Sequence, residues 1–404
     1  MPLPNRNTVA PPLLSFADLN AAPHKLYREL RHEFPFVQRE DGAFLVLRAH
    51  DVQALVSDPR TRQIETELVR ARGITSGPVI ELVSNSLLFS NGDTHRRRRQ
   101  PLSRSFAFRM MEGLRAKVRL LAEELLTLKL GDGEMRLREE YAAAIPAIAI
   151  AAILGIPRCD VPVFTAMAYR VSKILTTSWT QEDLPDIEAA INELSAYVAT
   201  LIDDRRKRPQ GDFLSDYVAS VDQAAEMSAA EAVMQIVSVV LGGTDTTRAA
   251  IVIMVGLLLE QRGGLWQALR HRPTMVAAAV AESLRIEPAV ASIPRLASED
   301  ISLDGHVIPT GRPVLLSTMS SLRDPDVFAD PDHFKFSRPM GKWHPVFGGG
   351  EHRCLGEALA RVEMEEALAA LLNLPLDPEI GDQRLRVHGH AGIRQVDELI
   401  VQWR

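Results

Sequence analysis

The chain has 404 residues, of which 46% are hydrophobic and 24% are charged, and its formal net charge is −6. This composition is ordinary for a globular protein, and the acidic balance argues against a nucleic-acid-binding protein. The longest apolar run, Tyr141 to Ile156, is interrupted by Pro146 and is shorter than a membrane span. Residues 1–16 contain no apolar segment of the signal-peptide type. We therefore expect a cytoplasmic protein without membrane association, with both cysteines, Cys159 and Cys354, as free thiols.

Helical patterning dominates the chain, and strand-like segments are short. In chain order, the patterns predict a strand within residues 42–50, helices within 113–130, 186–208 and 229–243, and a hairpin with an Asp-Gly turn within 301–318. The run at 141–156 is expected to be a buried core helix. No internal repeat or low-complexity linker divides the chain. The predicted fold class is mainly α with small β-sheets.

A basic run extends from His95 to Arg99. Such runs usually form a solvated helix face. His95 and Arg99, however, are four residues apart and share one side of a helix. The planar guanidinium of arginine is well suited to binding a carboxylate through two hydrogen bonds.

The apolar helical segment 239–260 is interrupted by small and polar residues. Gly242 and Gly243 each weaken a helix by roughly 1 kcal/mol relative to alanine. Asp245 and Thr246 follow, where a buried helix should be apolar. This pattern indicates either a local opening that admits a small ligand or a kink in which Thr246 bonds to a backbone carbonyl. The segment alone does not distinguish the two.

Glu282 and Arg285 are three residues apart and are therefore neighbours on one helix face. An exposed pair of this kind is common and contributes little to stability.

Cys354 lies between a glycine run, 348–350, and a helical segment that follows Gly356. The glycines allow a tight turn and close approach to a flat group. Backbone N–H groups at a helix start favour a thiolate. Such a thiolate is a metal ligand or a nucleophile, with His352 as a nearby base; the alternative is a buried apolar cysteine. A single cysteine argues against structural zinc or an iron–sulfur cluster, whereas haem iron needs only one protein ligand.

The spacing of Phe347, Gly350, His352, Cys354 and Gly356 resembles the haem-binding signature of cytochrome P-450 monooxygenases, closest to soluble bacterial members. The segments around His95, Thr246 and Glu282 occur along the chain in the same order as their counterparts in this family. The resemblance implies haem b (iron protoporphyrin IX) as cofactor and O₂ as co-substrate. It also implies one domain over residues 1–404, a helix-rich body with a small N-terminal β-rich lobe.

The resemblance also implies roles for individual residues. Cys354 is the thiolate ligand of the iron, with Phe347 and Gly356 beside it, while His352, His95, Arg99 and Arg295 hold the haem propionates. Thr246 lies beside an oxygen pocket, and Asp245 relays protons towards it. A buried structural network joins Glu282 and Arg285 to His333. The substrate pocket is expected to include Ser238, Leu241, Gly242, Val290, Ala291, Ser292, Ile293 and Ile393.

The pocket residues are mostly apolar, so we expect a small or medium apolar substrate, with Arg394 facing solvent. Arg96, Arg97 and Arg98 are expected to face outward and, with Arg353 and Arg361, to form a basic patch. The resemblance implies that this patch binds a ferredoxin or flavodoxin served by an NAD(P)H-dependent reductase. We expect a monomer.

The resulting hypothesis is an oxygen-activating haem-thiolate monooxygenase that hydroxylates or O-dealkylates its substrate. A non-catalytic haem sensor and a peroxide-using haem enzyme are the alternatives. The Asp245–Thr246 pair favours the oxygen-using enzyme, and no DNA-reading segment supports the sensor.

Overall fold

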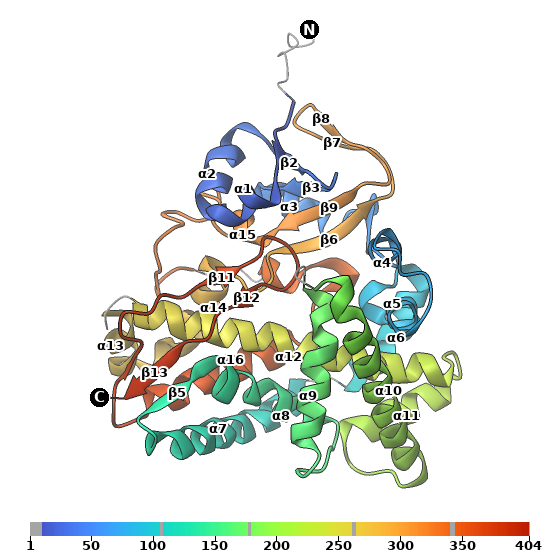
Figure 1. Cartoon of the computed structure of the whole chain (residues 1–404), viewed down its shortest axis with the longest axis vertical. Coiled ribbons are helices and arrows are strands. Elements are labelled where there is room, and N and C mark those ends of the chain that lie inside the picture. Colours follow the sequence, from blue (N-terminus) through green and yellow to red (C-terminus); the bar gives the residue numbers. More distant parts are fainter. Residues whose placement is uncertain (1–9, 106–107, 177–178, 261–263, 340–343, 404) are drawn as a thin grey trace.

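The computed structural model describes residues 10–105, 108–176, 179–260, 264–339 and 344–403. A small lobe that carries most of the strands lies above a larger helical body (Figure 1). The predicted fold class, mainly α with small β-sheets, is confirmed. The helices are α1 Phe16–Ala21, α2 Pro23–Glu33, α3 Ala49–Leu55, α4 Glu67–Ala71, α5 Pro78–Asn85, α6 Gly92–Ser105, α7 Phe108–Leu130, α8 Ala144–Ile153, α9 Val161–Ser172, α10 Leu184–Lys207, α11 Phe213–Ala224, α12 Ala229–Glu260, α13 Gly264–His271, α14 Val276–Ile286, α15 Thr318–Ser321 and α16 Glu357–Leu372.

The main sheet of the upper lobe has the strand order β1-β2-β3-β9-β6-β4. Its centre is the parallel pair β3·β9, in register at Leu45 and Leu315, flanked by the antiparallel pair β6·β9. Smaller sheets are formed by β10-β13-β5, β11-β12 and β7-β8. The strands are β1 Leu13–Leu14, β2 Phe36–Arg39, β3 Phe44–Val46, β4 Thr61–Arg62, β5 Glu134–Arg136, β6 Ser292–Ala297, β7 Ile301–Leu303, β8 His306–Ile308, β9 Pro313–Ser317, β10 Pro378–Glu379, β11 Val387–His388, β12 Gln395–Val396 and β13 Ile400–Trp403.

The predicted hairpin is present as β7 and β8. Asp304 and Gly305 form its turn with φ angles of 48° and 83°, the left-handed conformation that two-residue hairpin loops require. The predicted strand within 42–50 is β3. The apolar run at 141–156 forms the end of a π-helical turn, η2 Leu137–Ala142, followed by α8, and is mostly buried as expected.

Helix α12 is the central helix of the body. It is long and apolar enough to cross a membrane, but 72% of its most apolar stretch is buried by the rest of the fold. A helix that is apolar on all sides is expected in the core of a large domain. Its first half packs into one hydrophobic core and its second half, from Ala249 onwards, into another. The polar interval 242–248 lies where these two cores meet.

The two glycines of α12 have different surroundings. The helix runs without a break through both of them, so the expected local opening is not an interruption of the helix. A Cβ at Gly243 would lie 2.7 Å from Cδ1 of Ile150, so this glycine lets α8 approach closely. A Cβ at Gly242 would meet no atom within 4 Å. Gly242 therefore faces open space.

A buried ionic network fixes α14 to the segment that follows α15. Glu282 accepts hydrogen bonds from Nε and Nη2 of Arg285, each at 2.8 Å, and from Nε of Arg338 at 3.0 Å. Both members of the Glu282–Arg285 pair are almost fully buried. Because a buried ion is costly unless it is paired, this network constrains the position of the chain segment that it joins.

His333, predicted to be part of this network, joins it through its backbone carbonyl and not through its side chain. That side chain is 74% exposed and pairs with Asp330, and only the His333 carbonyl contacts Arg285, at 3.3 Å. Arg338 takes its place, since a guanidinium can reach Glu282 and also donate to the carbonyls of Ala329 and Asp330.

Glu282→Gln removes the negative charge from between two buried guanidinium groups. We expect the free energy of unfolding of the holoprotein, measured by guanidinium chloride titration, to fall by about 3–5 kcal/mol. His333→Ala is the control, and its effect should stay within about 0.5 kcal/mol. Equal effects of the two substitutions would contradict this description of the network.

Candidate active site

A cavity of about 320 Å³ lies between α12 and the loop that carries Cys354. One wall comes from α12, and the opposite wall comes from the Cys354 loop and the first turns of α16. The β6 strand and the segment before it close a third side. Predicted site residues that line this cavity are Ser238, Gly242, Thr246, Val290, Ser292, Ile293, His95, Arg99, Phe347, His352, Cys354 and Gly356.

The Cys354 loop is shaped by two short helical turns, η6 Pro345–Phe347 and η7 Gly350–His352. Gly348 and Gly350 have φ angles of 69° and 61°, which favour glycine. A Cβ at Gly350 would also lie 2.9 Å from Oγ of Ser57. The backbone N–H of Cys354 donates to the carbonyl of Phe347 at 2.8 Å, which closes the loop just before α16. The glycines thus fix the sulfur at the cavity wall.

The Cys354 thiol is exposed, but to the cavity rather than to bulk water. Desolvation by the neighbouring protein raises the pKa of the Cys354 thiol. The backbone N–H of Gly356 and the guanidinium of Arg99 oppose the rise in pKa. A thiolate at this position therefore requires a positive partner inside the cavity, such as a metal ion.

Cationic and imidazole side chains converge at the edge of the cavity. The ring centroids of His95 and His352 lie 4.1 Å apart. Burial, together with His95, Arg295 and Arg99, lowers the pKa of His352 to about 3. Burial also lowers the pKa of Arg295 to about 10. Within the described residues, no carboxylate forms an ion pair with Arg99 or Arg295, which donate to the carbonyl of Arg353 at 2.6 Å and to Gln63 at 2.7 Å.

These features fit haem. A single thiol can bind the iron, and arginines without carboxylate partners can bind the propionates. Gly242 and Gly356 lie on opposite walls, and a Cβ at either would meet no atom within 4 Å. The walls can therefore accept a flat macrocycle.

Some predicted pocket residues lie outside the cavity lining. Leu241 and Ala291 are fully buried in hydrophobic cores, and Ile393 forms a β-bridge with Val290. Arg295 also lies outside the lining, although its positive charge contributes to the lowered pKa of His352. For Leu241, Ala291 and Arg295, a residue next to each in sequence lines the cavity, namely Gly242, Ser292 and Pro294. A shift of one position along a strand or helix turns a side chain to another face.

Asp245 and Thr246 point away from each other, to different sides of α12. Thr246 lines the haem cavity, and its hydroxyl donates to the carbonyl of Gly242 at 2.9 Å. Asp245 lines a second pocket and forms an ion pair with Arg248. Burial raises the pKa of Asp245, while Arg248 and Arg138 oppose that rise.

Glu363 of α16 is a cavity residue that the sequence reasoning missed. Neither carboxylate oxygen has a hydrogen-bond partner in the described chain; the Thr247 hydroxyl is near but outside hydrogen-bonding geometry. Burial raises the pKa of Glu363 well above its usual range, against an opposing contribution from Thr247. Gly356, Leu359, Ala360 and Glu363 recur at helical spacing, and this periodicity is the signal that could have identified Glu363.

Arg394 also differs from its prediction. Its side chain is 2% exposed and forms an ion pair with Glu287, rather than facing solvent. It further donates to the carbonyl of Gly389 at 3.1 Å. Because its charge is already balanced, Arg394 is not available to bind a carboxylate of a substrate in the haem cavity.

The comparisons with known proteins agree with this site. The cytochrome P450 family model matches residues 83–374. The chain belongs to the cytochrome P450 family. It is 43% identical to the plant-inducible cytochrome P450-pinF1 of Rhizobium radiobacter, over 98% of this chain and 94% of that protein. It is 33% identical to the mycinamicin IV hydroxylase/epoxidase of Micromonospora griseorubida, over 90% of each.

The fold comparison gives the same family. The crystal structure of CalO2 superposes on this cytochrome P450 with a TM-score of 0.89, at 27% identity, over 96% of this chain and 97% of that one. As a member of this family, the protein is an oxidoreductase that binds haem b and uses O₂ as co-substrate. The predictions of family, cofactor and enzyme class are confirmed.

Cys354→Ala removes the sulfur from the cavity wall. We expect the variant to lose the long-wavelength Soret band that a thiolate-ligated haem gives after reduction and addition of CO. Cys159→Ala is the matched control, because Cys159 is a free surface cysteine at the N-terminal side of α9. An unchanged band in Cys354→Ala would rule out this sulfur as the iron ligand.

Proposed function

We propose that this cytochrome P450 inserts one oxygen atom from O₂ into a small or medium apolar organic molecule, by hydroxylation or O-dealkylation. A ferredoxin or flavodoxin, reduced by an NAD(P)H-dependent reductase, delivers the electrons. The observation that carries the proposal is that Cys354 and Thr246 line one cavity. We also propose that the chain acts in the cytoplasm as a single-domain monomer.

The residues proposed to hold the haem are of two kinds, a ligand of the iron and partners of the haem carboxylates. Cys354 holds the iron, and the carboxylates of the haem are held by His95, His352, Arg99 and Arg295. When bound, the haem supplies the activation of O₂. Phe347 packs beside the sulfur and is itself covered by the guanidinium of Arg361, 4.9 Å from the ring centroid. This cover limits the access of water to the proximal side.

The proposed proton delivery uses Thr246, which lines the haem cavity, and Asp245, which lines the neighbouring pocket. The Thr246 hydroxyl donates its hydrogen to Gly242, so its oxygen can accept a hydrogen bond from water in the cavity. Asp245 lies in the pocket on the other side of the same helix turn. The Asp245 carboxyl lies in one pocket and the Thr246 hydroxyl in the other. We propose that protons pass from the first to the second across α12. The pair also favours O₂ over peroxide as the oxidant.

An apolar substrate suits the remaining cavity wall. Leu87, Leu88, Val239, Val290 and Ile293 provide aliphatic surface. The Ser238 hydroxyl is already engaged, with the carbonyl of Met234 at 2.6 Å and the Ser86 hydroxyl at 2.7 Å. The Ser292 hydroxyl, in contrast, is buried without a partner within the described chain. The proposed substrate is therefore mainly apolar, and the Ser292 hydroxyl is available to bind a polar group on it.

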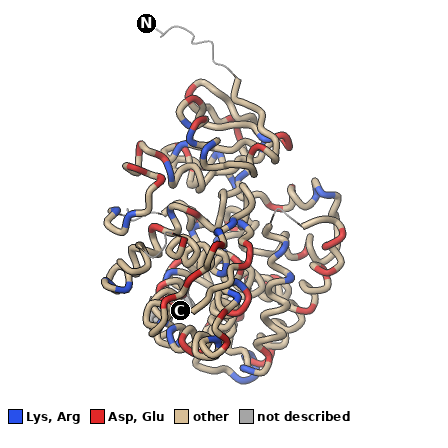
Figure 2. Tube along the Cα trace, turned by 60° about the vertical axis from the view of Figure 1, so that its left-hand side comes forward, with Lys and Arg blue, Asp and Glu red and all other residues tan. Residues whose placement is uncertain are grey.

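The proposed electron-transfer surface differs from the expected one. Arg97 and Arg98 both form ion pairs with Glu231, and Arg98 is buried, so these two do not face outward as free charges. Acidic and basic residues are interspersed along the chain (Figure 2). Arg353, beside Cys354, and Arg361 both bind Glu357 but stay partly exposed. We therefore propose that the electron-transfer protein binds at Arg353 and Arg361, with Arg96 at the edge of that surface.

The sensor alternative differs from the proposed function in a measurable way. A haem sensor binds a ligand and changes its affinity for another macromolecule without consuming reductant. Substrate-dependent consumption of NAD(P)H in the presence of a ferredoxin and its reductase, with an oxygenated product, distinguishes the two. Absence of product from a panel of apolar compounds that displace iron-bound water would contradict the proposed function.

Thr246→Ala should keep reductant consumption but lower the fraction that yields product, because the hydroxyl that orients cavity water is lost. The measurement is product and hydrogen peroxide formed per NAD(P)H consumed. Thr244→Ala is the control: Thr244 makes the same bond to a helix carbonyl, at 2.9 Å from Val240, but is buried outside the cavity lining. Equal coupling in Thr246→Ala and the native enzyme would remove Thr246 from proton delivery.

Arg353→Gln should slow reduction by the ferredoxin, measured by stopped flow, and slow it most at low salt, because a surface charge is screened as ionic strength rises. Arg206→Gln is the control, since Arg206 lies on α10 and pairs with Asp222 and Asp203. A rate in Arg353→Gln that equals that of the control at every salt concentration would exclude this docking surface.

A further inference from the structure

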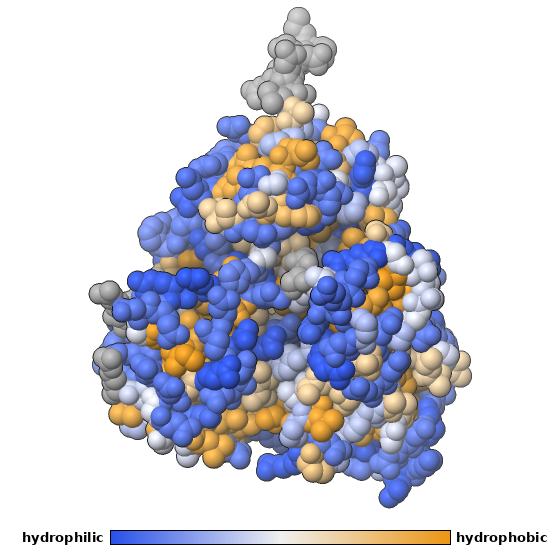
Figure 3. Space-filling view, in the orientation of Figure 1, coloured by the Kyte–Doolittle hydropathy of each residue, from blue (hydrophilic) through white to orange (hydrophobic). Residues whose placement is uncertain are grey.

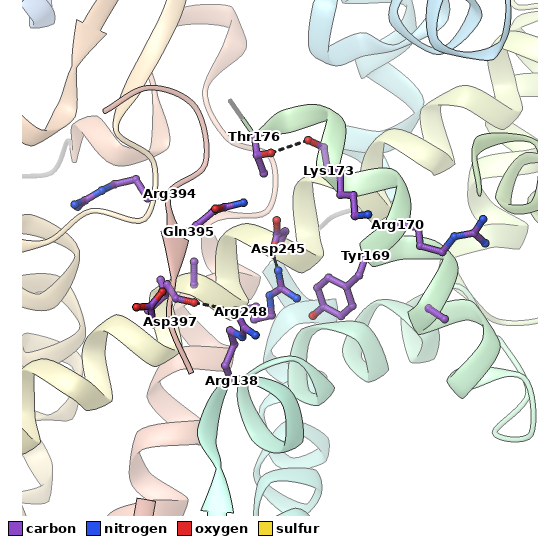
Figure 4. Close-up of a pocket in the computed structure, with 13 residues that line it drawn as sticks. Arg138, Tyr169, Arg170, Lys173, Thr176, Asp245, Arg248, Arg394, Gln395 and Asp397 are labelled. Carbon is purple, nitrogen blue, oxygen red and sulfur yellow. Dashed lines mark hydrogen bonds and ion pairs between the residues drawn. The ribbon is translucent and has the colours of Figure 1, made fainter. Parts of the chain in front are cut away.

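A second pocket, of about 390 Å³, borders α12 at Asp245, Arg248 and Ala249, and Cys354 is not part of its lining (Figure 4). It is formed by α9, the turn η3 Lys173–Leu175, α12 and β12. We propose that this pocket binds the carboxylate of a small organic acid, between Arg138, Lys173 and Arg248, at a site separate from the haem cavity.

The lining of the pocket is rich in positive charge. Arg138, Arg170, Lys173, Arg248 and Arg394 contribute cations, against the two carboxylates of Asp245 and Asp397. The face of the molecule in Figure 3 is correspondingly hydrophilic and hollowed near its centre, where the upper lobe meets the body. This excess differs from the net charge of the chain, which is −6. A concentration of cations in a concave site attracts an anion.

Two of these cations are already neutralised and point out of the pocket. Arg394 binds Glu287, and Arg170 binds Asp186 and Glu193. Figure 4 shows both guanidinium groups directed away from the centre of the pocket. They are therefore not ligands for the anion.

The other three cations are incompletely paired. Lys173 has only distant carboxylates, Asp183 at 3.8 Å and Asp186 at 3.6 Å. Arg138 donates to the carbonyl of Val396 at 3.0 Å and to Glu139 at 3.4 Å, while its Nε lies 4.0 Å from Glu398 and has no hydrogen-bond partner in the described chain. Each therefore retains hydrogen-bonding capacity for an oxyanion.

Arg248 is the central group. Among the described residues, its one ion-pair partner is Asp245, and its guanidinium lies over the Tyr169 ring, 4.2 Å from the centroid. Stacking holds the planar guanidinium in place, and such a group can present further N–H donors to a carboxylate. The Tyr169 hydroxyl is engaged with the carbonyl of Ala143 at 2.8 Å, so the ring cannot readily swing away.

The rest of the lining indicates an organic anion. Ala166, Ala249 and Val396 give the pocket small apolar surfaces between the charged groups. A compact aliphatic or aromatic acid can place its carboxylate on the arginines and its apolar body on these side chains. A fully hydrated inorganic anion would leave these apolar surfaces unused.

The bound carboxylate and Asp245 compete for Arg248. Binding of the acid draws Arg248 away from Asp245, and the Asp245 carboxylate then loses its cationic partner. By linkage, if binding of the acid favours protonation of Asp245 by some factor, protonation of Asp245 strengthens binding of the acid by that same factor. The pocket is therefore a place where a small acid can alter the group that we assign to proton delivery.

The test is isothermal titration calorimetry of benzoate into the holoprotein, with the haem cavity first saturated by 4-phenylimidazole. Blocking the haem cavity separates this site from the proposed substrate site, so failure of one proposal is distinguishable from failure of the other. We expect benzoate, but not the neutral benzamide, to bind. Loss of benzoate binding in the presence of 4-phenylimidazole, or no binding at all, would overturn the proposal.

Variants assign the binding to named residues. Arg248→Gln should weaken benzoate binding about tenfold or more, and Asp245→Asn should strengthen it. Arg170→Gln is the matched control, with a cation of the same pocket that points outward, and should leave the affinity unchanged. Lys173 also lines the pocket, and Lys173→Gln should weaken benzoate binding as well. This variant replaces Arg248→Gln in the test if Arg248→Gln does not retain haem. Equal affinities in Arg248→Gln and Arg170→Gln, or weaker binding in Asp245→Asn, would contradict the assignment.

Discussion

A thiol that faces an enclosed cavity is the constraint on which the rest of this structure depends. Ionising Cys354 inside the protein is unfavourable unless a positive charge is supplied nearby, because burial penalises an unpaired charge. A metal ion held by a macrocycle supplies that charge, and the macrocycle brings carboxylates of its own. In the proposed assignment, those carboxylates pair with Arg99 and Arg295, which have no carboxylate partner among the described residues.

The remainder of the fold positions α12 and the Cys354 loop, which both line the cavity. On one side, α12 is anchored in two hydrophobic cores, and its glycines and hydroxyl fall at the junction between them. On the other side, the buried Glu282–Arg285–Arg338 network fixes the chain that leads into the Cys354 loop. Rigid walls favour a site that is formed before the cofactor or substrate binds.

The sequence allowed prediction of those features that depend on local spacing. The hairpin at Asp304-Gly305, the central helix and the Cys354 loop each follow from residues that are adjacent in the chain. The choice between a kink and an opening in α12 did not follow, and the structure shows a continuous helix with Gly242 facing open space. The glycines permit both arrangements, and only the packing of α8 against Gly243 distinguishes them.

Features that depend on partners distant in sequence were predicted poorly. Arg394 was expected in solvent but is buried because Glu287 lies beside it, and Arg338 rather than His333 completes the network around Glu282. Asp245 and Thr246 are adjacent in sequence yet face separate pockets, since consecutive helical residues differ by about 100° in direction. Ion-pair partners and side-chain directions are set by tertiary packing, which spacing alone does not determine.

The central claim is that the sulfur of Cys354 binds the haem iron. X-ray absorption at the iron edge of the ferric holoprotein tests it most directly, because the first coordination shell distinguishes sulfur from nitrogen and oxygen. The account predicts one sulfur scatterer in that shell in the native protein and in Cys159→Ala. An iron shell of nitrogen and oxygen alone would contradict it.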